Sequence, residues 1–240
     1  RALTLGEVTA QTKTYDGTRA ADTSKFRAAL GNVVTGEENS VTATAADASY
    51  NDKNVVQANA VSYTGVSLTG TGAGNYSIVN TAQGTGTIAK RTLTVGAVTA
   101  QTKTYDGTTA ADAAAFRATL DNVVAGEESS VTATATGAAY NDKTVAGANK
   151  VSYTGVALQG TGAGNYSLAA TTAEGVGTIA KRALTVGTVT AQTKTYDGTT
   201  AADAAEFQAT LGNLVAGEES SVAATAMGAA YNDKNVAVAN

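Results

Sequence analysis

The chain has 240 residues, of which 43% are hydrophobic and 15% are charged, and it contains no cysteine, histidine, proline or tryptophan. Without cysteine or histidine it can form no disulfide and no thiol or imidazole catalytic site, so we expect no enzyme activity. The net charge is −4, and the only recurrent basic clusters are Lys90-Arg91 and Lys181-Arg182, so we expect no nucleic-acid partner. No apolar run approaches the ~20 residues that span a bilayer, so we expect no membrane insertion.

One stretch, Val-Thr-Ala-Gln-Thr-Lys-Thr-Tyr-Asp-Gly-Thr, occurs three times, starting at Val8, Val98 and Val189. Matching text surrounds each copy, and a regular spacing of this kind indicates a tandem array of one domain type. We expect three domains, at residues 1–90, 91–181 and 182–240. The third has no counterpart of residues 150–181, so we expect it to be incomplete at its C-terminal end.

The second repeat begins with alternating polar and apolar residues. This pattern predicts strands at residues 92–95 and from Val98 onward, each with one buried face, and Gly96 between them is expected to break or bulge the run. The strand then reaches Tyr105-Asp106-Gly107-Thr108. An Asp-Gly pair after β-favouring residues predicts a turn, because glycine tolerates positive φ and aspartate can bond its own backbone.

Residues 110–120 are the one segment of the repeat with a helix-favouring composition. They predict one short helix, with Asp112 as its N-cap and with Phe116 and Leu120 on a shared face. A strand is the alternative, because β-rich surroundings often override the helix propensity of alanine.

The rest of the repeat is expected to be β-structure and turns. We predict a turn at residues 126–128, a strand end and turn at residues 140–143, a loop at residues 160–165, and strands at residues 131–135, 151–158, 166–168 and 176–179. The predicted fold class is therefore mainly β: a tandem array of small β-rich domains, each a β-sandwich or β-grasp-like unit.

The junction between repeats is short. Only residues 180–183 lie between Ile179 and Leu184, which leaves little room for a flexible linker. We therefore expect the domains to sit end to end with restricted bending, each adding about 35 to 45 Å.

Five motifs follow one another in the second repeat: Lys-Thr-Tyr-Asp-Gly-Thr-Thr-Ala-Ala (103–111), Val-Val-Ala-Gly-Glu-Glu (123–128), Asn-Asp-Lys-Thr-Val-Ala (141–146), Gly-Ala-Gly-Asn-Tyr-Ser-Leu (162–168) and Gly-Thr-Ile-Ala-Lys-Arg-Ala-Leu-Thr-Val (177–186). This series resembles the YDG repeat, which is named for its Tyr-Asp-Gly motif. The family occurs in bacterial surface adhesins, including filamentous-haemagglutinin-like exoproteins. The resemblance implies a structural stalk module of a secreted cell-surface protein that carries an adhesive region for attachment or biofilm formation, with no enzyme activity and no cofactor.

The Tyr-Asp-Gly motif is the principal candidate site, and we interpret it as structural. In each copy we expect the tyrosine to pack over the sheet and the Asp-Gly pair to form the turn. A buried tyrosine needs a partner for its hydroxyl, and the motif aspartate or a backbone carbonyl is the candidate. The residues are Tyr15, Asp16 and Gly17, then Tyr105, Asp106 and Gly107, then Tyr196, Asp197 and Gly198.

Other motifs allow further hypotheses that the sequence favours less. Carboxylates at Asp16, Asp22, Glu37, Glu38 and Asp52 suit calcium but lack its dense spacing. The glycine loops at residues 70–74 and 160–164 fit hairpin loops better than phosphate sites. Asn75-Tyr76-Ser77 and Asn165-Tyr166-Ser167 match the glycosylation pattern. An amide bond to an asparagine could form from Lys13 or Lys53. Two functional alternatives to the stalk stay open: repeats that bind a host glycan or protein, and a self-assembling matrix fibre.

Overall fold

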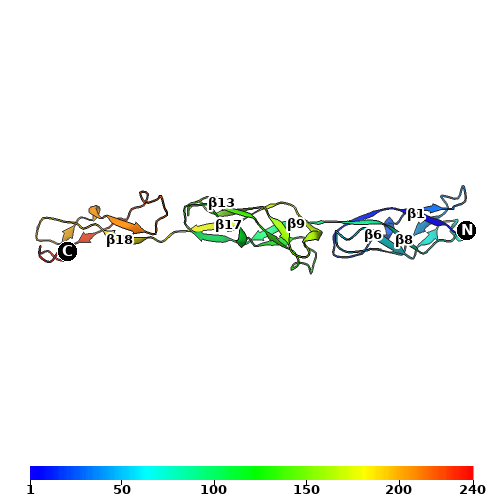
Figure 1. The fold of residues 1–240 in the computed structure, drawn as a ribbon, viewed down its shortest axis with the longest axis horizontal. Coiled ribbons are helices and arrows are strands. Elements are labelled where there is room, and N and C mark those ends of the chain that lie inside the picture. The colour runs from blue at the N-terminus through cyan, green and yellow to red at the C-terminus, as the bar shows by residue number, and fades with distance from the viewer. Residues whose placement is uncertain (240) are drawn as a thin grey trace. The chain divides into compact units, whose positions relative to one another are not determined.

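The computed structural model describes residues 1–239. Over these residues the chain forms 21 strands and five three-residue 3-10 helices, and it contains no α-helix (Figure 1). It divides into two compact units, and the division runs through the second repeat. Unit 1 consists of residues 1–99, 112–139 and 152–175, and unit 2 consists of residues 100–111, 140–151 and those from 176 onward. Strands β13 (Gly137–Tyr140), β14 (Lys150–Thr154) and β17 (Thr172–Ala180) continue from one unit into the other.

The first repeat lies entirely in unit 1 and contains one four-stranded sheet and two strand pairs. The sheet has the order β2-β8-β6-β5, with β2 parallel to β8 and the other neighbours antiparallel. The paired strands are β1 with β3 and β4 with β7, both antiparallel. The bounds are β1 Thr4–Val8, β2 Gln11–Thr14, β3 Ala28–Gly31, β4 Thr42–Thr44, β5 Asp47–Tyr50, β6 Ala60–Thr64, β7 Ser67–Thr69 and β8 Thr81–Ala89.

The second repeat repeats these pairings. In unit 1, β9 (Arg91–Val98) lies between β11 (Ala118–Asp121) and β16 (Tyr166–Leu168), and β12 (Thr132–Thr134) pairs with β15 (Ala157–Gln159). In unit 2, β10 (Gln101–Thr104) pairs in parallel with β17. The third repeat, also in unit 2, pairs β18 (Thr185–Val189) with β20 (Ala209–Gly212) and β19 (Ala201–Ala202) with β21 (Ala229–Ala230). The 3-10 helices are Thr23–Lys25, Ala73–Asn75, Ala113–Ala115, Ala163–Asn165 and Ala204–Glu206.

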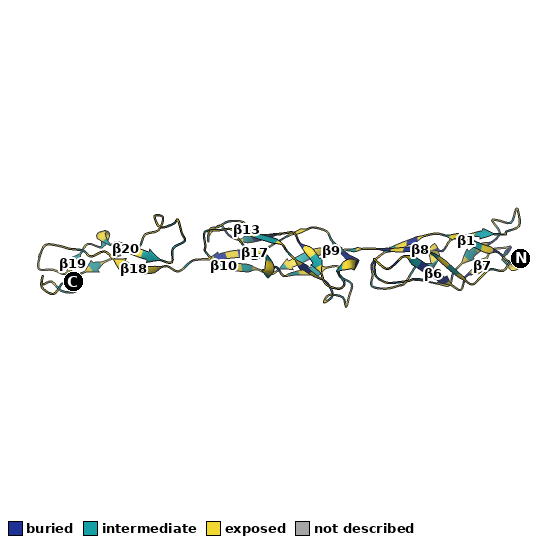
Figure 2. Ribbon diagram, viewed as in Figure 1, coloured by how far each residue is buried: buried dark blue, intermediate teal, exposed yellow. Residues whose placement is uncertain are grey.

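The core of unit 1 is built from aromatic and β-branched side chains on alternate strand positions. Along β6, Val61 and Tyr63 are buried whereas Ser62 and Thr64 are exposed, as the side-chain period of a strand requires. Figure 2 shows the ribbon coloured by burial. The Phe26 ring packs on Tyr63 with their centroids 4.7 Å apart. One buried cluster joins these residues to Leu93, Val131 and Tyr166 of the second repeat, so the two repeats share a core within unit 1.

The mainly β fold class is confirmed, and so is the irregularity at Gly96. The pairing of β9 with β11 shifts register between Val95 and Val98, on either side of Gly96. A Cβ at Gly96 would lie 2.4 Å from the Thr119 hydroxyl, so a larger residue there would have to displace the Thr119 side chain.

The predicted helix at residues 110–120 is wrong. Asp112 does act as a cap, because its Oδ1 accepts a hydrogen bond from the Ala114 amide at 2.9 Å. However, the capped element is the single 3-10 turn Ala113–Ala115, and strand β11 begins at Ala118. The Phe116 ring packs on Tyr153 at a centroid distance of 4.7 Å, so tertiary packing and pairing with β9 override the helix propensity of the alanines.

The single strand predicted at residues 151–158 is instead two strands. β14 ends at Thr154 and β15 begins at Ala157, because Gly155 adopts a φ of +61° and turns the chain. The strands predicted at residues 131–135 and 166–168 correspond to β12 and β16, and the loop at residues 160–165 contains a 3-10 turn. The strand predicted at residues 176–179 is longer, because β17 begins at Thr172, and Val98 ends β9 and does not begin a strand of its own.

Replacement of Gly160 should destabilise the protein. Gly160 has a φ of +110°, and a Cβ there would lie 2.3 Å from the Ser130 carbonyl oxygen. We expect Gly160→Ala to lower the free energy of unfolding by about 2 to 4 kcal/mol, because strain in the left-handed region adds to the backbone clash. Gly164→Ala is the matched control in the same loop: a Cβ there would meet nothing within 4 Å, and we expect a change within about 0.5 kcal/mol. Urea unfolding measures both, and equal effects would contradict the prediction.

Candidate functional site

Each Tyr-Asp-Gly motif lies in a loop that closes around a lysine ammonium group. In the first repeat, Lys13 Nζ donates to Asp16 Oδ1 at 2.7 Å, to the Thr18 carbonyl at 2.9 Å and to the Ala20 carbonyl at 3.0 Å. The Thr18 amide also donates to Asp16 Oδ1 at 2.9 Å, and Gly17 turns the chain with a φ of +79°. The ammonium group lies 5.3 Å from the centre of the Tyr50 ring, where a cation–π attraction supports it.

The same loop recurs around Lys103 and Lys194. In both, the lysine donates to the motif aspartate, Asp106 or Asp197, at 2.7 and 2.9 Å respectively. These hydrogen bonds, together with those from the following threonine, lower the pKa of each carboxyl to about 2. The Asp-Gly pair therefore forms a turn held by a side chain of its own repeat.

The motif tyrosine has a different partner: it reaches the next repeat. Tyr15 is only 1% exposed, and its hydroxyl donates to Glu127 Oε1 at 2.7 Å. The same carboxylate accepts the Tyr166 hydroxyl at 2.7 Å, and the two rings pack edge to face with centroids 5.3 Å apart. The predicted acceptors, Asp16 or a backbone carbonyl, are wrong, because Asp16 is already engaged by Lys13 and Thr18.

An asparagine of the second repeat adds two further bonds to the first. Asn165 Oδ1 accepts from the Val55 amide at 2.9 Å, and Asn165 Nδ2 donates to Asn54 Oδ1 at 3.0 Å. Lys53 Nζ lies 3.5 Å from Glu127 Oε1. We name this cluster the repeat joint; it consists of Tyr15, Lys53, Asn54 and Val55 of the first repeat and Glu127, Asn165 and Tyr166 of the second.

The tyrosine–glutamate contact recurs in unit 2. The Tyr105 hydroxyl donates to Glu218 of the third repeat. Gly107 approaches Val215 just as Gly17 approaches Val124, since a Cβ on either glycine would lie 3.0 Å from the valine methyl group. Tyr196, the third motif tyrosine, is 60% exposed.

A family model described as the YDG domain matches residues 1–84, 89–173 and 180–240. The chain belongs to the YDG domain family. No curated protein and no solved structure matches it. The three matched segments are the three YDG repeats, so the joint connects neighbouring members of one family.

The charge state of the joint follows from its burial and hydrogen bonds. Burial raises the pKa of Tyr15 well above its usual range, and the neighbouring Glu127 raises it further. The same causes raise the pKa of Tyr166 to about 12. Burial also opposes ionisation of Glu127, but hydrogen bonds from both phenols and the charge of Lys53 outweigh it and lower the pKa of that carboxyl. At neutral pH the joint therefore holds two neutral phenols and one carboxylate.

The remaining candidate motifs have structural surroundings. Asp22 caps a 3-10 turn through the Ser24 amide, and within residues 1–239 no three acidic side chains gather as a metal site would require. The Gly160–Gly164 loop closes on the Ser130 carbonyl, which accepts the Gly162 amide at 3.0 Å. Asn165 of the second Asn-Tyr-Ser motif is buried in the joint, whereas Asn75 of the first is exposed. Among the described residues, no helix has the length and apolar character that crossing a membrane requires.

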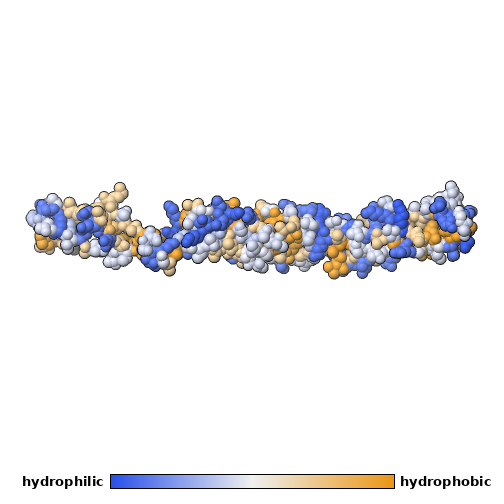
Figure 3. Space-filling view, turned by 90° about the horizontal axis from the view of Figure 1, so that it is seen from above, coloured by the Kyte–Doolittle hydropathy of each residue, from blue (hydrophilic) through white to orange (hydrophobic). Residues whose placement is uncertain are grey.

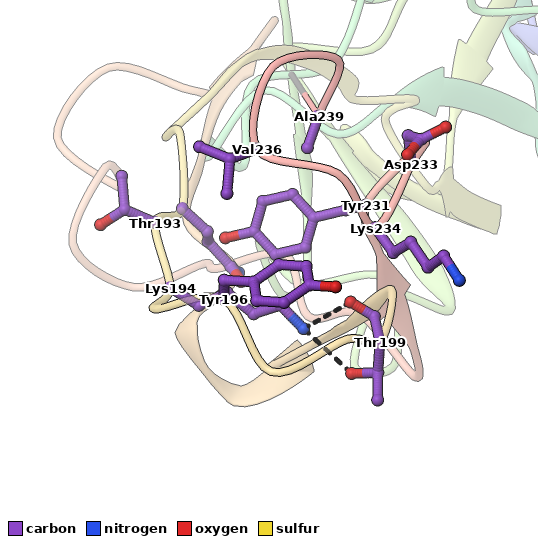
Figure 4. Close-up of a pocket in the computed structure, with 10 residues that line it drawn as sticks. Thr193, Lys194, Tyr196, Thr199, Tyr231, Asp233, Lys234, Val236 and Ala239 are labelled. Carbon is purple, nitrogen blue, oxygen red and sulfur yellow. Dashed lines mark hydrogen bonds between the residues drawn. The ribbon is translucent and has the colours of Figure 1, made fainter.

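The third YDG repeat has a hollow of about 180 Å³ (Figure 4). It is lined by Lys194, Tyr196, Thr199, Tyr231 and Val236, among others. At the equivalent place in the first repeat, strand β2 pairs with β8, and the Gln11 amide donates to the Tyr63 hydroxyl at 2.8 Å. Residues 182–239 contain no counterpart of β8 or Tyr63. The hollow therefore lies where strand β8 pairs with β2 in the first repeat.

Removal of the Tyr15 hydroxyl should loosen the joint. We expect Tyr15→Phe to leave Glu127 with one phenol fewer and to reduce the protection of the Val55 amide against hydrogen exchange about 5- to 30-fold, corresponding to about 1 to 2 kcal/mol for a lost hydrogen bond to a charged group. Tyr196→Phe is the matched control, because Tyr196 is exposed. If both variants left the Val55 amide as protected as in the wild type, the joint would not depend on this bond.

The joint should also weaken in acid. The folded-state pKa of Glu127 lies below its unfolded value of about 4.3. Ionised Glu127 therefore stabilises the joint above that pH, and this contribution is lost as the pH falls through the folded-state pKa. We expect the protection factor of the Val55 amide to fall as the pH drops through the lowered pKa of Glu127. Glu127→Gln should remove this pH dependence, whereas Glu37→Gln, in the first repeat, should retain it; a pH-independent wild type would contradict the assignment.

Proposed function

We propose that this chain is the structural repeat stalk of a large secreted bacterial cell-surface adhesin, where it projects an adhesive region for cell attachment or biofilm formation. Its site of action is then the extracellular face of the bacterial surface, and its partners are the neighbouring repeats of the same chain. The proposal rests on the structural roles of the residues that are repeated most faithfully. Lys13, Asp16 and Gly17 form a loop, and Tyr15 forms the joint to the next repeat.

Two features of unit 1 support a stalk. β8 ends at Ala89 and β9 begins at Arg91, so Lys90 alone connects the strands of adjacent repeats. The joint then adds side-chain bonds across the same boundary. Repeat proteins gain stability from such nearest-neighbour contacts, and a connection of one residue gives little freedom to bend.

The surface is consistent with a spacer. The face seen in Figure 3 carries small separate groups of hydrophobic side chains among hydrophilic ones. Charged residues make up 15% of the chain, and the net charge is −4. Large apolar patches usually mark binding sites, so a mixed, weakly charged surface fits a spacer better than a receptor-binding module.

Small-angle scattering of the full chain tests the stalk. We expect the maximum dimension of the particle to increase by about 35 to 45 Å for each complete repeat. The double variant Tyr15→Ala/Tyr105→Ala should be shorter on average, because its joints can bend. A compact wild-type particle would refute the stalk, and specific binding of this chain to host cells or to a glycan array would favour the alternative of a binding module.

A further inference from the structure

The repeat joint holds the rings of two tyrosines from neighbouring repeats in contact. The Tyr15 and Tyr166 rings lie edge to face, with their centroids 5.3 Å apart and their planes inclined at 81°. Both residues are 1% exposed, and both belong to unit 1. The folded chain therefore keeps two phenol rings close enough that a small movement brings their edges into bonding contact, without the entropic cost of an encounter.

The hydroxyl groups of the two rings converge on one acceptor. Glu127 Oε2 accepts the Tyr166 hydroxyl at 2.7 Å, and the Tyr15 hydroxyl lies 2.7 Å from Oε1 and 3.0 Å from Oε2. The ring carbons beside the two hydroxyl groups are therefore gathered at the same carboxylate. In an oxidised phenol these carbons share the unpaired electron with the oxygen, and they are the atoms at which two oxidised phenols couple.

The carboxylate also assists the removal of an electron from either phenol. A phenol that loses an electron becomes a strong acid, so its oxidation is easiest where a base takes the proton at the same time. Burial raises the pKa of Tyr166 to about 12, so this phenol does not release its proton to water beforehand. Glu127, whose pKa is lowered, is ionised at neutral pH and lies within hydrogen-bond distance of both hydroxyl groups.

The composition of the chain directs oxidation toward tyrosine. The sequence contains ten tyrosines, no tryptophan, cysteine or histidine, and one methionine, Met227. Met227 belongs to unit 2, whereas the joint belongs to unit 1. Tyrosine is therefore the side chain of unit 1 that gives up an electron most readily.

A cavity of about 290 Å³ gives small molecules access to the joint. Its lining includes Tyr15, Glu127, Asn165 and Lys53. The Lys53 side chain is 49% exposed, and its ammonium group lies 3.5 Å from Glu127 Oε1. The positive charge of Lys53 offsets the negative charge of Glu127, so the cavity does not repel a small anionic oxidant.

We propose that the repeat joint is a site of oxidative cross-linking, at which Tyr15 and Tyr166 form a dityrosine bond that joins two repeats covalently. The co-reactant is a small one-electron oxidant, such as the carbonate radical anion. Two of these radicals each take one electron and one proton and become two bicarbonate ions. One C–H bond beside the hydroxyl group breaks in each ring, one C–C bond forms between the two rings, and both hydroxyl groups are retained. This modification is an addition to the stalk and does not rest on it.

Pulse radiolysis of the full chain in bicarbonate solution supplies carbonate radicals and tests the proposal. We expect the blue fluorescence of dityrosine. After digestion with trypsin, mass spectrometry should find peptide 14–19 linked to peptide 151–181, with fragment ions that place the bond at Tyr15 and Tyr166. At chain concentrations of about 1 to 10 µM, far below the millimolar effective concentration of tethered groups, the yield per chain should not depend on concentration.

Three variants assign the reaction to the residues of the joint. Tyr15→Phe keeps the ring but lacks one phenol, so it should lose the linked peptide pair. Tyr196→Phe is the matched control, because it removes an exposed tyrosine outside the joint and should leave the yield unchanged. Glu127→Gln should lower the initial rate of coupling about tenfold or more, because an amide takes up no phenol proton at neutral pH. Hydrogen exchange of the Val55 amide checks that the joint is still formed in each variant.

The outcomes separate coupling at the joint from unspecific oxidation. A wild type that forms no dityrosine, or forms it only between other tyrosines or between chains, would overturn the proposal. The same linked peptide pair at an unchanged yield in Tyr15→Phe would also overturn it, and an unchanged rate in Glu127→Gln would overturn the role of the carboxylate. None of these results would alter the scattering test of the stalk.

Discussion

The hydrogen bonds from two phenols to the carboxylate of Glu127 are the contact on which the boundary between the first two repeats depends. Tyr15 comes from one repeat and Tyr166 from the next, and both are buried. A buried phenol without an acceptor would cost free energy, whereas a bond to a carboxylate is among the stronger hydrogen bonds in proteins. The edge-to-face packing of the rings adds apolar contact at the same place.

The residues of the Tyr-Asp-Gly motif divide between local and non-local roles. The lysine, aspartate, glycine and threonine close a loop within the repeat, and the tyrosine leaves it for the neighbour. The third repeat separates the two roles, because the loop around Lys194 is intact while Tyr196 is exposed. The bonds of the loop lie within one repeat, whereas the hydroxyl of Tyr15 bonds a residue of the next repeat. Both roles are contacts within the chain itself.

The sequence by itself determined the periodic organisation, the β class and most strand positions. Alternation of polar and apolar residues indicates directly which face of a strand is buried, because side chains alternate between the two faces. The Asp-Gly pairs indicate turns, and Gly96 indicates a bulge, because both depend on local backbone geometry. It also determined the membership of the YDG family, because five motifs recur in one order at fixed spacing. The helix predicted around Phe116 failed because propensity is a weak local preference, and packing on Tyr153 with pairing to β9 overrode it.

Only the tertiary structure decided the partner of the motif tyrosine. Tyr15 and Glu127 are 112 residues apart, and Asn54 and Asn165 are 111 apart. No periodicity or turn signal relates residues at such a separation, because the contact arises from how the end of one folded repeat meets the start of the next. The sequence predicted a polar turn at the Gly-Glu-Glu motif, and for Asn-Tyr-Ser it offered only a weak match to the glycosylation pattern. Both motifs recur in the same order as the tyrosine motif, but that recurrence contains no information on which of them lie close together in space.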